Sequence, residues 1–262
     1  MITAGVDIGS RSAKAVLMEN NHIISWSLID TSGDSVDIAN KAFREAISKC
    51  GRFLERDVEY IVATGYGRVN APFAHRTITE ISCHAKGASW FFPSVRTILD
   101  MGGQDCKAIR CEKEKVVNFV LNDKCAAGTG RYLEKTAATL GISLQEMGEL
   151  SLQIVEKPAS VNSYCAIFAQ NDILTLVSQG THRNDILAGA CQAIAERMLT
   201  MLSRVGGIER EFCISGGIAK NVGVVSRIEA TLGFKCLVAP EPQIVGAVGA
   251  AIFASESAKG LR

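Results

Sequence analysis

A ten-residue motif that occurs twice constrains the fold of this chain more than any other feature. Segments 7–16 and 100–109 align without a gap at an offset of 93 residues (7 to 100), and Asp, Gly, Lys and Ala coincide. Each copy joins two apolar runs through a Gly-containing turn, and a polar turn follows each copy. Four identities in ten positions can arise by chance, but these fall within matching strand–turn–strand units. The sequence therefore predicts an internal duplication.

Length and composition exclude several classes of protein. The chain has 262 residues, enough for one large domain or two small ones with a core that needs no disulfides. With 47% hydrophobic residues, 21% charged residues and a net charge of +1, it is not predominantly disordered and shows no electrostatic sign of nucleic-acid or anionic-membrane partners. No apolar run approaches the roughly 18 residues that span a bilayer, and residues 1–7 do not resemble a signal peptide. We therefore expect a cytoplasmic protein.

The pattern of elements predicts an α/β fold with two duplicated βββαβα-type halves around a cleft. A strand meander, a helix and a buried strand open the chain, and the same order restarts near residue 97 before a second half richer in helix. We expect one subdomain formed by 1–95 and 245–262, and another formed by 96–244. The predicted strands are 2–8, 13–18, 22–24, 58–63, 97–99, 211–215 and 234–239, and the predicted helices are 37–54, 131–140, 166–178, 185–205 and 245–254.

Both copies of the motif place a carboxylate at a strand end, directly before a glycine turn. Asp7 precedes Gly9-Ser10, and Asp100 precedes Gly102-Gly103. Glycine lets backbone N–H groups approach a phosphate, and a nearby carboxylate holds Mg²⁺ or its waters rather than the anionic phosphate. One copy alone is equally well interpreted as an ordinary hairpin, but two facing copies would grip a polyphosphate. No GxxxxGK[ST] motif is present, so a Walker P-loop is excluded.

A third glycine site, Ser215-Gly216-Gly217, follows a predicted buried strand and suits close approach to a ribose or purine. A helix is predicted to begin near Asn221. The order of phosphate, phosphate and adenosine sites resembles that of the actin-like ATPase (ribonuclease H-like) superfamily, which includes sugar kinases, heat-shock chaperones and actin. The resemblance implies ATP or ADP with Mg²⁺ in an interdomain cleft. It implies nucleotide-binding roles for Gly9, Ser10, Ser12, Lys14, Asp100, Gly102, Gly103, Gln104, Ser215, Gly216, Gly217, Asn221 and Gln243, with Asp7 holding Mg²⁺ through water.

Nine cysteines need an explanation in a chain expected to lie in a reducing compartment. Their number is odd and no CxxC occurs, so we expect neither a disulfide framework nor a common zinc or redox motif. Most are expected to be small buried hydrophobes. Cys125 and Cys165 differ, because each precedes a predicted helix whose N-terminus favours a thiolate. Two such thiolates are half of an iron–sulfur ligand set, although two buried helix-start cysteines would give the same pattern.

Stretches that cover nearly the whole chain resemble one family. They are VDIGSRSAK, ATGYGR, SCHAKGA, DMGGQD, NDKCAAGTGR, CAIFAQ and SGGIAKN. The chain resembles the ATP-dependent activators (component A) of 2-hydroxyacyl-CoA dehydratases and the related ATPase subunits of benzoyl-CoA reductase. The resemblance implies a homodimer that shares one 4Fe-4S cluster, with Cys125 and Cys165 matching the two ligand positions per chain. Cys106 and Cys111 are the competing pair, and we expect them to be structural because no family motif contains them.

The resemblance also implies an activity. ATP hydrolysis would be coupled to low-potential one-electron transfer onto a partner iron–sulfur dehydratase or reductase, with reduced ferredoxin or flavodoxin as the electron donor. The alternatives are the ATPase subunit of a benzoyl-CoA reductase complex, a sugar kinase of the same fold, or a non-catalytic ATP-gated scaffold. A sugar kinase would need a catalytic Asp before the second hairpin, and residues 90–94 offer none.

One position departs from the family pattern. Relatives usually have Glu where this chain has Gln170, and the superfamily places a residue near this point beside the γ-phosphate. Gln orients water but takes no proton, so Asp7 and Asp105 become the expected polar partners of catalysis beside Gln170. The four histidines, among them His84, are expected to have surface or hydrogen-bonding roles.

Overall fold

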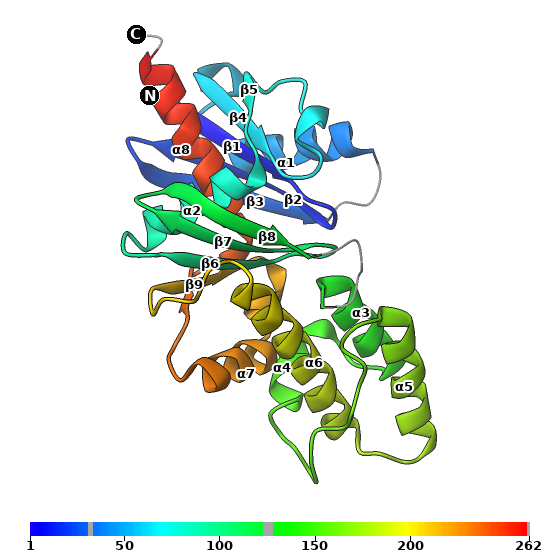
Figure 1. Ribbon diagram of the computed structural model, residues 1–262. Helices are drawn as coiled ribbons and strands as arrows, with labels where there is room; N and C mark the ends of the chain where they lie inside the picture. The colour runs from blue at the N-terminus through cyan, green and yellow to red at the C-terminus, as the bar shows by residue number, and fades with distance from the viewer. Residues whose placement is uncertain (31–33, 123–127, 261–262) are drawn as a thin grey trace. The chain divides into compact units, whose positions relative to one another are not determined.

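The structure is a computed structural model that describes residues 1–30, 34–122 and 128–260 (Figure 1). The chain divides into two compact units. The first comprises Met1–Ile98, Cys111–Val117 and Ala239–Arg262, and the second comprises Leu99–Arg110 and Asn118–Val238. These units differ from the expected subdomains mainly at residues 111–117 and 239–244, which group with the first unit.

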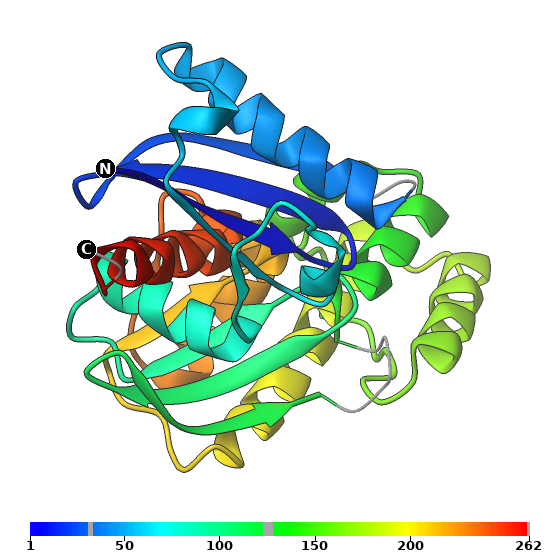
Figure 2. The same cartoon turned by 90° about the horizontal axis from the view of Figure 1, so that it is seen from above.

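The first unit is built on a five-stranded sheet. Its elements are β1 (Ile2–Ile8), β2 (Ser12–Glu19), β3 (His22–Asp30), β4 (Tyr60–Thr64), β5 (Arg76–Thr77), α1 (Ser35–Cys50), α2 (Glu80–Phe91) and α8 (Val245–Gly260). The strand order is β3-β2-β1-β4-β5, with β1 antiparallel to β2 and parallel to β4. Figure 2 shows α1 on one face of this sheet and α8 on the other. Both faces of β1 are therefore covered, which is why every residue of β1 is buried.

Capping residues fix both ends of α1. The Asp34 carboxylate accepts hydrogen bonds from the N–H groups of Val36 (2.8 Å) and Asp37 (3.2 Å). At the other end Gly51 adopts φ 65° and donates its N–H to the Ile47 carbonyl. This left-handed glycine ends the helix at Cys50, so the predicted helix over 37–54 was too long at its C-terminus.

Glycines allow α2 and α8 to pack backbone against backbone. A Cβ on Gly249 would lie 1.8 Å from the Cys83 carbonyl oxygen, and one on Gly87 would lie 2.0 Å from that of Val245. The small-residue helix predicted over 245–254 is confirmed, and it continues to Gly260. Helix α2 was not predicted, because its buried face consists mainly of Ala, Gly and Cys rather than of a periodic row of large apolar residues.

The second unit repeats the same sheet with more helices. Its elements are β6 (Thr97–Met101), β7 (Cys106–Glu112), β8 (Lys115–Leu121), β9 (Phe212–Ser215), β10 (Leu237–Val238), α3 (Gly130–Thr139), α4 (Leu144–Leu150), α5 (Ala166–Ser178), α6 (Arg183–Ser203) and α7 (Val222–Leu232). The strand order is β10-β9-β6-β7-β8. Residues 97–98, 111–112 and 115–117 of these strands group with the first unit. Met147 of α4, Ile194 of α6, Ile228 of α7 and Phe212 of β9 share one buried core.

The two sheets have one topology. In each, a central strand (β1 or β6) has its hairpin partner and a third strand on one side and two later strands on the other. This confirms the α/β fold class and the predicted duplication. Short 3-10 helices cover Glu55–Asp57, Arg68–Asn70, Gly217–Lys220 and Pro242–Ile244. Across the described ranges, every helix is too short or too polar to cross a membrane.

Candidate functional site

The first hairpin of the repeated motif holds a buried ion pair. Asp7 at the end of β1 lies opposite Lys14 in β2, and the Lys14 ammonium is 3.3 Å from Asp7 Oδ2. The same ammonium donates to the Ser12 carbonyl at 3.3 Å. The turn between them is closed by the Gly9 N–H, which donates to the Ser12 carbonyl at 3.0 Å. Gly9 and Ser10 therefore form a turn whose backbone is held between two strands.

The second hairpin has the same geometry. Asp100 at the end of β6 is 3.3 Å from the Lys107 ammonium, and the Gly102 N–H donates to the Asp105 carbonyl at 2.9 Å. Lys107 also pairs with the Asp105 carboxylate at 2.8 Å. Ser12 and Asp105 thus hold equivalent turn positions, and the offset of 93 residues between the sequence motifs (7 to 100) is also a structural equivalence.

One difference between the hairpins concerns their aspartates. Asp100 has both oxygens engaged, since Lys107 pairs with Oδ2 and the Ser215 hydroxyl donates to Oδ1 at 3.0 Å. On Asp7, Lys14 pairs with Oδ2, while Oδ1 faces Gly65, which follows the neighbouring strand β4. Carboxylate oxygens are the hard ligands that Mg²⁺ and its waters prefer. Asp7 therefore fits a magnesium role better than Asp100 does.

A glycine follows the parallel neighbour of each central strand. Gly65 follows β4 with φ 89°, and Gly216 follows β9 with φ 83°. A Cβ would lie 2.4 Å from Asp7 Oδ1 at Gly65, and 2.4 Å from the Met101 carbonyl oxygen at Gly216. Gly216 was predicted as a site residue, but Gly65 was missed. Its signal was available, because Thr64-Gly65 follows the predicted buried strand 58–63, much as Gly216 follows the predicted strand 211–215.

His84 is a second residue that the sequence reasoning missed as a site neighbour. It lies on α2 and is only 5% exposed, so it has no surface role. A Cβ on Gly246 would lie 2.9 Å from His84 Nε2 and 3.3 Å from Asp7 Oδ2, so the imidazole and the carboxylate approach the same glycine. The preceding Cys83 thiol is inert, because burial raises its pKa to about 12.

The predicted adenosine segment is confirmed as a strand end followed by a helix start. Ser215 ends β9, Gly217 begins a 3-10 helix, and Asn221 caps α7 by accepting from the Val224 N–H at 3.1 Å. Asn221 Nδ2 is buried and has no hydrogen-bond partner among the described atoms, so this amide keeps a donor for a ligand. Gln243 lies in the first unit, where its N–H donates to the Glu241 carboxylate at 3.1 Å.

Gln170 lies away from the hairpin of its own unit. Its amide donates to the Thr139 hydroxyl, at the C-terminal end of α3. The hairpin turn contacts the other end of α3, where the N–H groups of Gly130 and Arg131 donate to the carbonyls of Gly102 and Gly103. Nine residues of α-helix separate the two ends, a distance of roughly 13 Å at 1.5 Å per residue. Within the second unit, the structure does not bring Gln170 to the turn that includes Gln104 and Asp105.

Cys165 lies at a helix start, as predicted. It is the N-cap residue of α5 and is half-buried. The Asn162 side chain accepts from the N–H groups of Tyr164 (2.9 Å) and Cys165 (2.8 Å), which fixes this segment before the helix begins. Cys125, the other predicted ligand, falls in 123–127 and lies outside the described residues.

The competing cysteines have the properties of structural residues. Cys106 and Cys111 are fully buried, and their thiols donate to the carbonyls of Gly128 (3.4 Å) and Val95 (3.6 Å). Burial, and secondarily the charge of Asp100, raises the pKa of the Cys106 thiol to about 12. Such a thiol is a poor source of the thiolate that iron requires.

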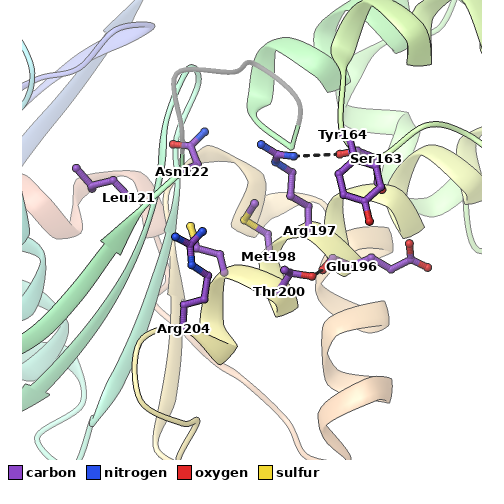
Figure 3. A pocket seen from close by; sticks show the side chains of 10 residues that line it. Leu121, Asn122, Ser163, Tyr164, Glu196, Arg197, Met198, Thr200 and Arg204 are labelled. Carbon is purple, nitrogen blue, oxygen red and sulfur yellow. Dashed lines mark hydrogen bonds between the residues drawn. The ribbon is translucent and has the colours of Figure 1, made fainter.

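A pocket of about 280 Å³ lies beside the segment that leads into Cys165 (Figure 3). Its walls are the end of β8, residues 163–164, side chains of α6 from Glu196 to Met201, and Arg204, which caps that helix. In Figure 3 the Arg197 guanidinium points at the Ser163 carbonyl, to which it donates at 3.4 Å.

The duplicated sheets, each with an Asp–Gly hairpin, define the fold as that of an actin-like ATPase. Solved structures of proteins with similar sequences have the same fold. Component A of (R)-2-hydroxyglutaryl-CoA dehydratase from Acidaminococcus fermentans superposes with a TM-score of 0.94 at 34% identity, covering 99% of each chain. The activator of 2-hydroxyisocaproyl-CoA dehydratase from Clostridium difficile, with bound ADPNP, has a TM-score of 0.93 at 35% identity, covering 100% of this chain and 97% of its own.

Sequence comparison narrows the class to a family. Residues 4–254 match the model of the BadF/BadG/BcrA/BcrD ATPase family. The activator of lactoyl-CoA dehydratase from Anaerotignum propionicum is 42% identical over 260 residues, which are 99% of each chain. The chain belongs to the BadF/BadG/BcrA/BcrD ATPase family, as the sequence motifs had indicated.

Proposed function

We propose that this chain is an ATP-dependent reductive activator. It hydrolyses ATP and passes single low-potential electrons to a partner iron–sulfur enzyme of the 2-hydroxyacyl-CoA dehydratase kind. Support comes from similar proteins that are named activators of such dehydratases, one of them solved with ADPNP. The observation that carries the proposal is the combination, in one chain, of two matching Asp–Lys hairpins with a half-buried cysteine at the start of α5.

The hairpins supply the groups for nucleotide binding. Their turn N–H groups bind phosphate oxygens, and Lys14 and Lys107 place positive charge behind each turn. A bound Mg²⁺ would supply positive charge beside the phosphate oxygens. Asp7 would hold it through water, because Oδ1 of Asp7 faces Gly65.

Orientation of the attacking water is assigned to carboxylates rather than to Gln170. Asp105 is 43% exposed in its side chain and is held by Lys107, so it combines accessibility with a fixed position. Asp7 is the second candidate. Gln170 is committed to Thr139, which favours a role in joining α5 to α3.

The cysteine site fits an iron–sulfur cluster by the chemistry of its donors. The Cys165 thiol is half-buried, and it lies at the N-cap of α5, where a cysteine sulfur is a soft ligand of the kind that iron–sulfur clusters take. A bound 4Fe-4S cluster would accept and release one electron at a time. The second ligand of the chain is Cys125. Two thiolates per chain complete a four-thiolate set only when two chains combine, so the active form is a homodimer.

The surface beside Cys165 supports that assembly. Tyr164, Ile167 and Phe168 are 79%, 69% and 61% exposed, an unusual density of large apolar side chains around one cysteine. Exposed apolar patches of this kind mark protein–protein contacts. A second copy of the chain would remove these side chains from water and bring a second pair of cysteines to the site.

The energy that such coupling requires is modest. Lowering an effective one-electron potential by about 0.2 V needs roughly 5 kcal/mol, at 1.4 kcal/mol per 59 mV. A ligand shifts a two-state equilibrium by its difference in affinity for the two states, and phosphate-dependent contacts at the hairpins can differ by this amount.

An anaerobic electron-transfer assay tests the proposal. The purified protein is expected to be brown, to hydrolyse Mg-ATP, and, once reduced by ferredoxin or flavodoxin, to reduce a 2-hydroxyacyl-CoA dehydratase only when ATP is present. A colourless protein that phosphorylates a sugar, or that binds ATP without any redox activity, would contradict it. ATP-dependent transfer to a benzoyl-CoA reductase alone would favour that alternative.

A further inference from the structure

His84 is a buried imidazole that glycine contacts between two helices bring to the first hairpin. It lies on α2, which packs backbone against backbone on α8 through Gly87 and Gly249 (Figure 2). The first turn of α8 then places Gly246 beside both the His84 imidazole and the Asp7 carboxylate. All of these residues belong to the first unit. The position of His84 is thus set by packed helices rather than by a loop.

One nitrogen of this imidazole lies close to one oxygen of the aspartate. A Cβ on Gly246 would stand 2.9 Å from His84 Nε2 and 3.3 Å from Asp7 Oδ2, so both atoms lie within 3.3 Å of one point. Oδ2 is also the oxygen that pairs with the Lys14 ammonium, at 3.3 Å. His84 and Lys14 therefore approach the same side of the carboxylate from two elements, α2 and β2, while Oδ1 faces Gly65.

The second hairpin supports its aspartate with a different group. There the hydroxyl of Ser215, the last residue of β9, donates to Asp100 Oδ1 at 3.0 Å. Thr64 is the last residue of β4 and lies opposite Asp7 in the parallel pairing with β1. Its hydroxyl does not donate to Asp7 among the described atoms. The buried polar group beside the first carboxylate is instead the His84 imidazole, which is 5% exposed.

We propose that His84 is a positioning residue of the nucleotide site: together with Lys14 it fixes the Asp7 carboxylate, so that the carboxylate can orient the water shell of a bound magnesium ion. This rests on the proposed nucleotide-binding function of the hairpin. Groups that hold the ligands of a metal from behind commonly change its affinity by about 10–100-fold. His84 acts through Asp7, and no contact with nucleotide or metal is assigned to it.

Calorimetric titration with the non-hydrolysable analogue ADPNP, once with Mg²⁺ and once with EDTA, tests the inference. The readout is the magnesium factor, defined as the ratio of the dissociation constant in EDTA to that in Mg²⁺. A general loss of stability weakens both titrations alike, whereas a misplaced Asp7 carboxylate lowers the factor. Urea unfolding of each variant shows whether it is folded.

His84→Asn and His84→Gln form a matched pair, because both carry an amide but only the longer Gln side chain reaches the position of Nε2. His84→Asn is expected to lower the magnesium factor about tenfold, and His84→Gln to keep most of it. Ser89→Ala is the control and should match the wild type, since Ser89 is also 5% exposed on α2. In the Asp7→Asn background, His84→Asn should cause no further loss, because the carboxylate through which it acts is absent.

A folded His84→Asn variant with the wild-type magnesium factor would overturn the inference. A further loss in the Asp7→Asn background, or a loss in His84→Gln as large as in His84→Asn, would overturn it as well. If His84→Asn does not fold, Gly246→Ala takes its place. Its added methyl group would crowd both the imidazole and the carboxylate and should lower the factor, so an unchanged factor would contradict the inference equally.

Failure of the proposed nucleotide site is distinguishable from these outcomes. In that case Asp7→Asn would itself keep the wild-type magnesium factor, whereas failure of the His84 inference alone leaves Asp7→Asn impaired.

Discussion

At the scale of single residues, the two motif aspartates are equivalent in position but not in environment. The Asp100–Lys107 pair is almost wholly buried, with side chains 5% and 3% exposed, and Ser215 completes its hydrogen bonding. Breaking a buried pair leaves an uncompensated charge. Asp7 and Lys14 keep slightly more exposure, and Asp7 faces a glycine on its second oxygen. We infer that Asp100 chiefly stabilises its hairpin, whereas Asp7 chiefly serves the ligand.

The first prediction separates these roles with matched amide substitutions. Asp7→Asn should weaken Mg-ATP binding more than tenfold, because the carboxylate that holds magnesium water is lost. Asp100→Asn should also lower the free energy of unfolding by about 3 kcal/mol, the scale for breaking a buried ion pair. Titration calorimetry and urea unfolding measure the two effects. Unchanged nucleotide affinity in Asp7→Asn would refute the assignment of this hairpin.

The second prediction concerns the buried thiol of Cys106. Because burial raises its pKa from the ordinary 9.0 to about 12, the folded state holds a proton that the unfolded state releases. This contribution to stability is complete below pH 9 and is lost as pH rises from 9 to about 12. Cys106→Ala should therefore flatten the alkaline fall in unfolding free energy. An alkaline slope in Cys106→Ala that equals that of the wild type would contradict this prediction.

At the scale of elements, each unit depends on one glycine after the parallel neighbour of its central strand. Gly65 and Gly216 have left-handed φ values, and neither leaves room for a Cβ. Gly65 lies against Asp7 at the end of β1, and Gly216 lies against Asp100 and Met101 at the end of β6. Each glycine thus lets the backbone approach the strand end that carries the hairpin aspartate. Gly233 shares the left-handed conformation, with φ 74°, but has open space where a Cβ would be.

The third prediction uses that contrast. Gly233→Ala should cost only the conformational strain of about 1–2 kcal/mol, the scale for a left-handed non-glycine residue. Gly65→Ala and Gly216→Ala should cost clearly more, because backbone atoms must also move, and both should weaken nucleotide binding. Equal losses of unfolding free energy in all three variants would show that the close contacts are not important.

Elements with a strong local pattern were predictable from sequence. The helix over 166–178 agrees with α5 at both ends, and the Asp–Gly hairpins follow the repeated motif. Helix α4 was missed although Ser143 and Glu146 form a capping box, because seven residues are too few for a clear apolar period. The burial of His84 beside Asp7 was not predictable, since it depends on α2 and α8, whose contact is made by glycines distant in sequence.

At the scale of the whole molecule, the duplication shows where the specialised function resides. Between the third and fourth strands, the first unit has residues 31–59 with α1, whereas the second has residues 122–211 with α3, α4, α5 and α6. Both predicted ligand cysteines fall in this longer connection. The sheets and hairpins are thus common to both halves, and the proposed redox site belongs to an addition in one half.

We propose that this chain uses Cys125 and Cys165 to share one cluster between two copies. The most direct test is iron analysis with EPR on anaerobically purified wild type, Cys125→Ser, Cys165→Ser and Cys106→Ala. We expect about four irons per dimer in the wild type and in Cys106→Ala, as for one 4Fe-4S cluster, and colourless protein from both serine variants. About four irons per monomer, or iron lost from Cys106→Ala but retained in Cys165→Ser, would contradict it.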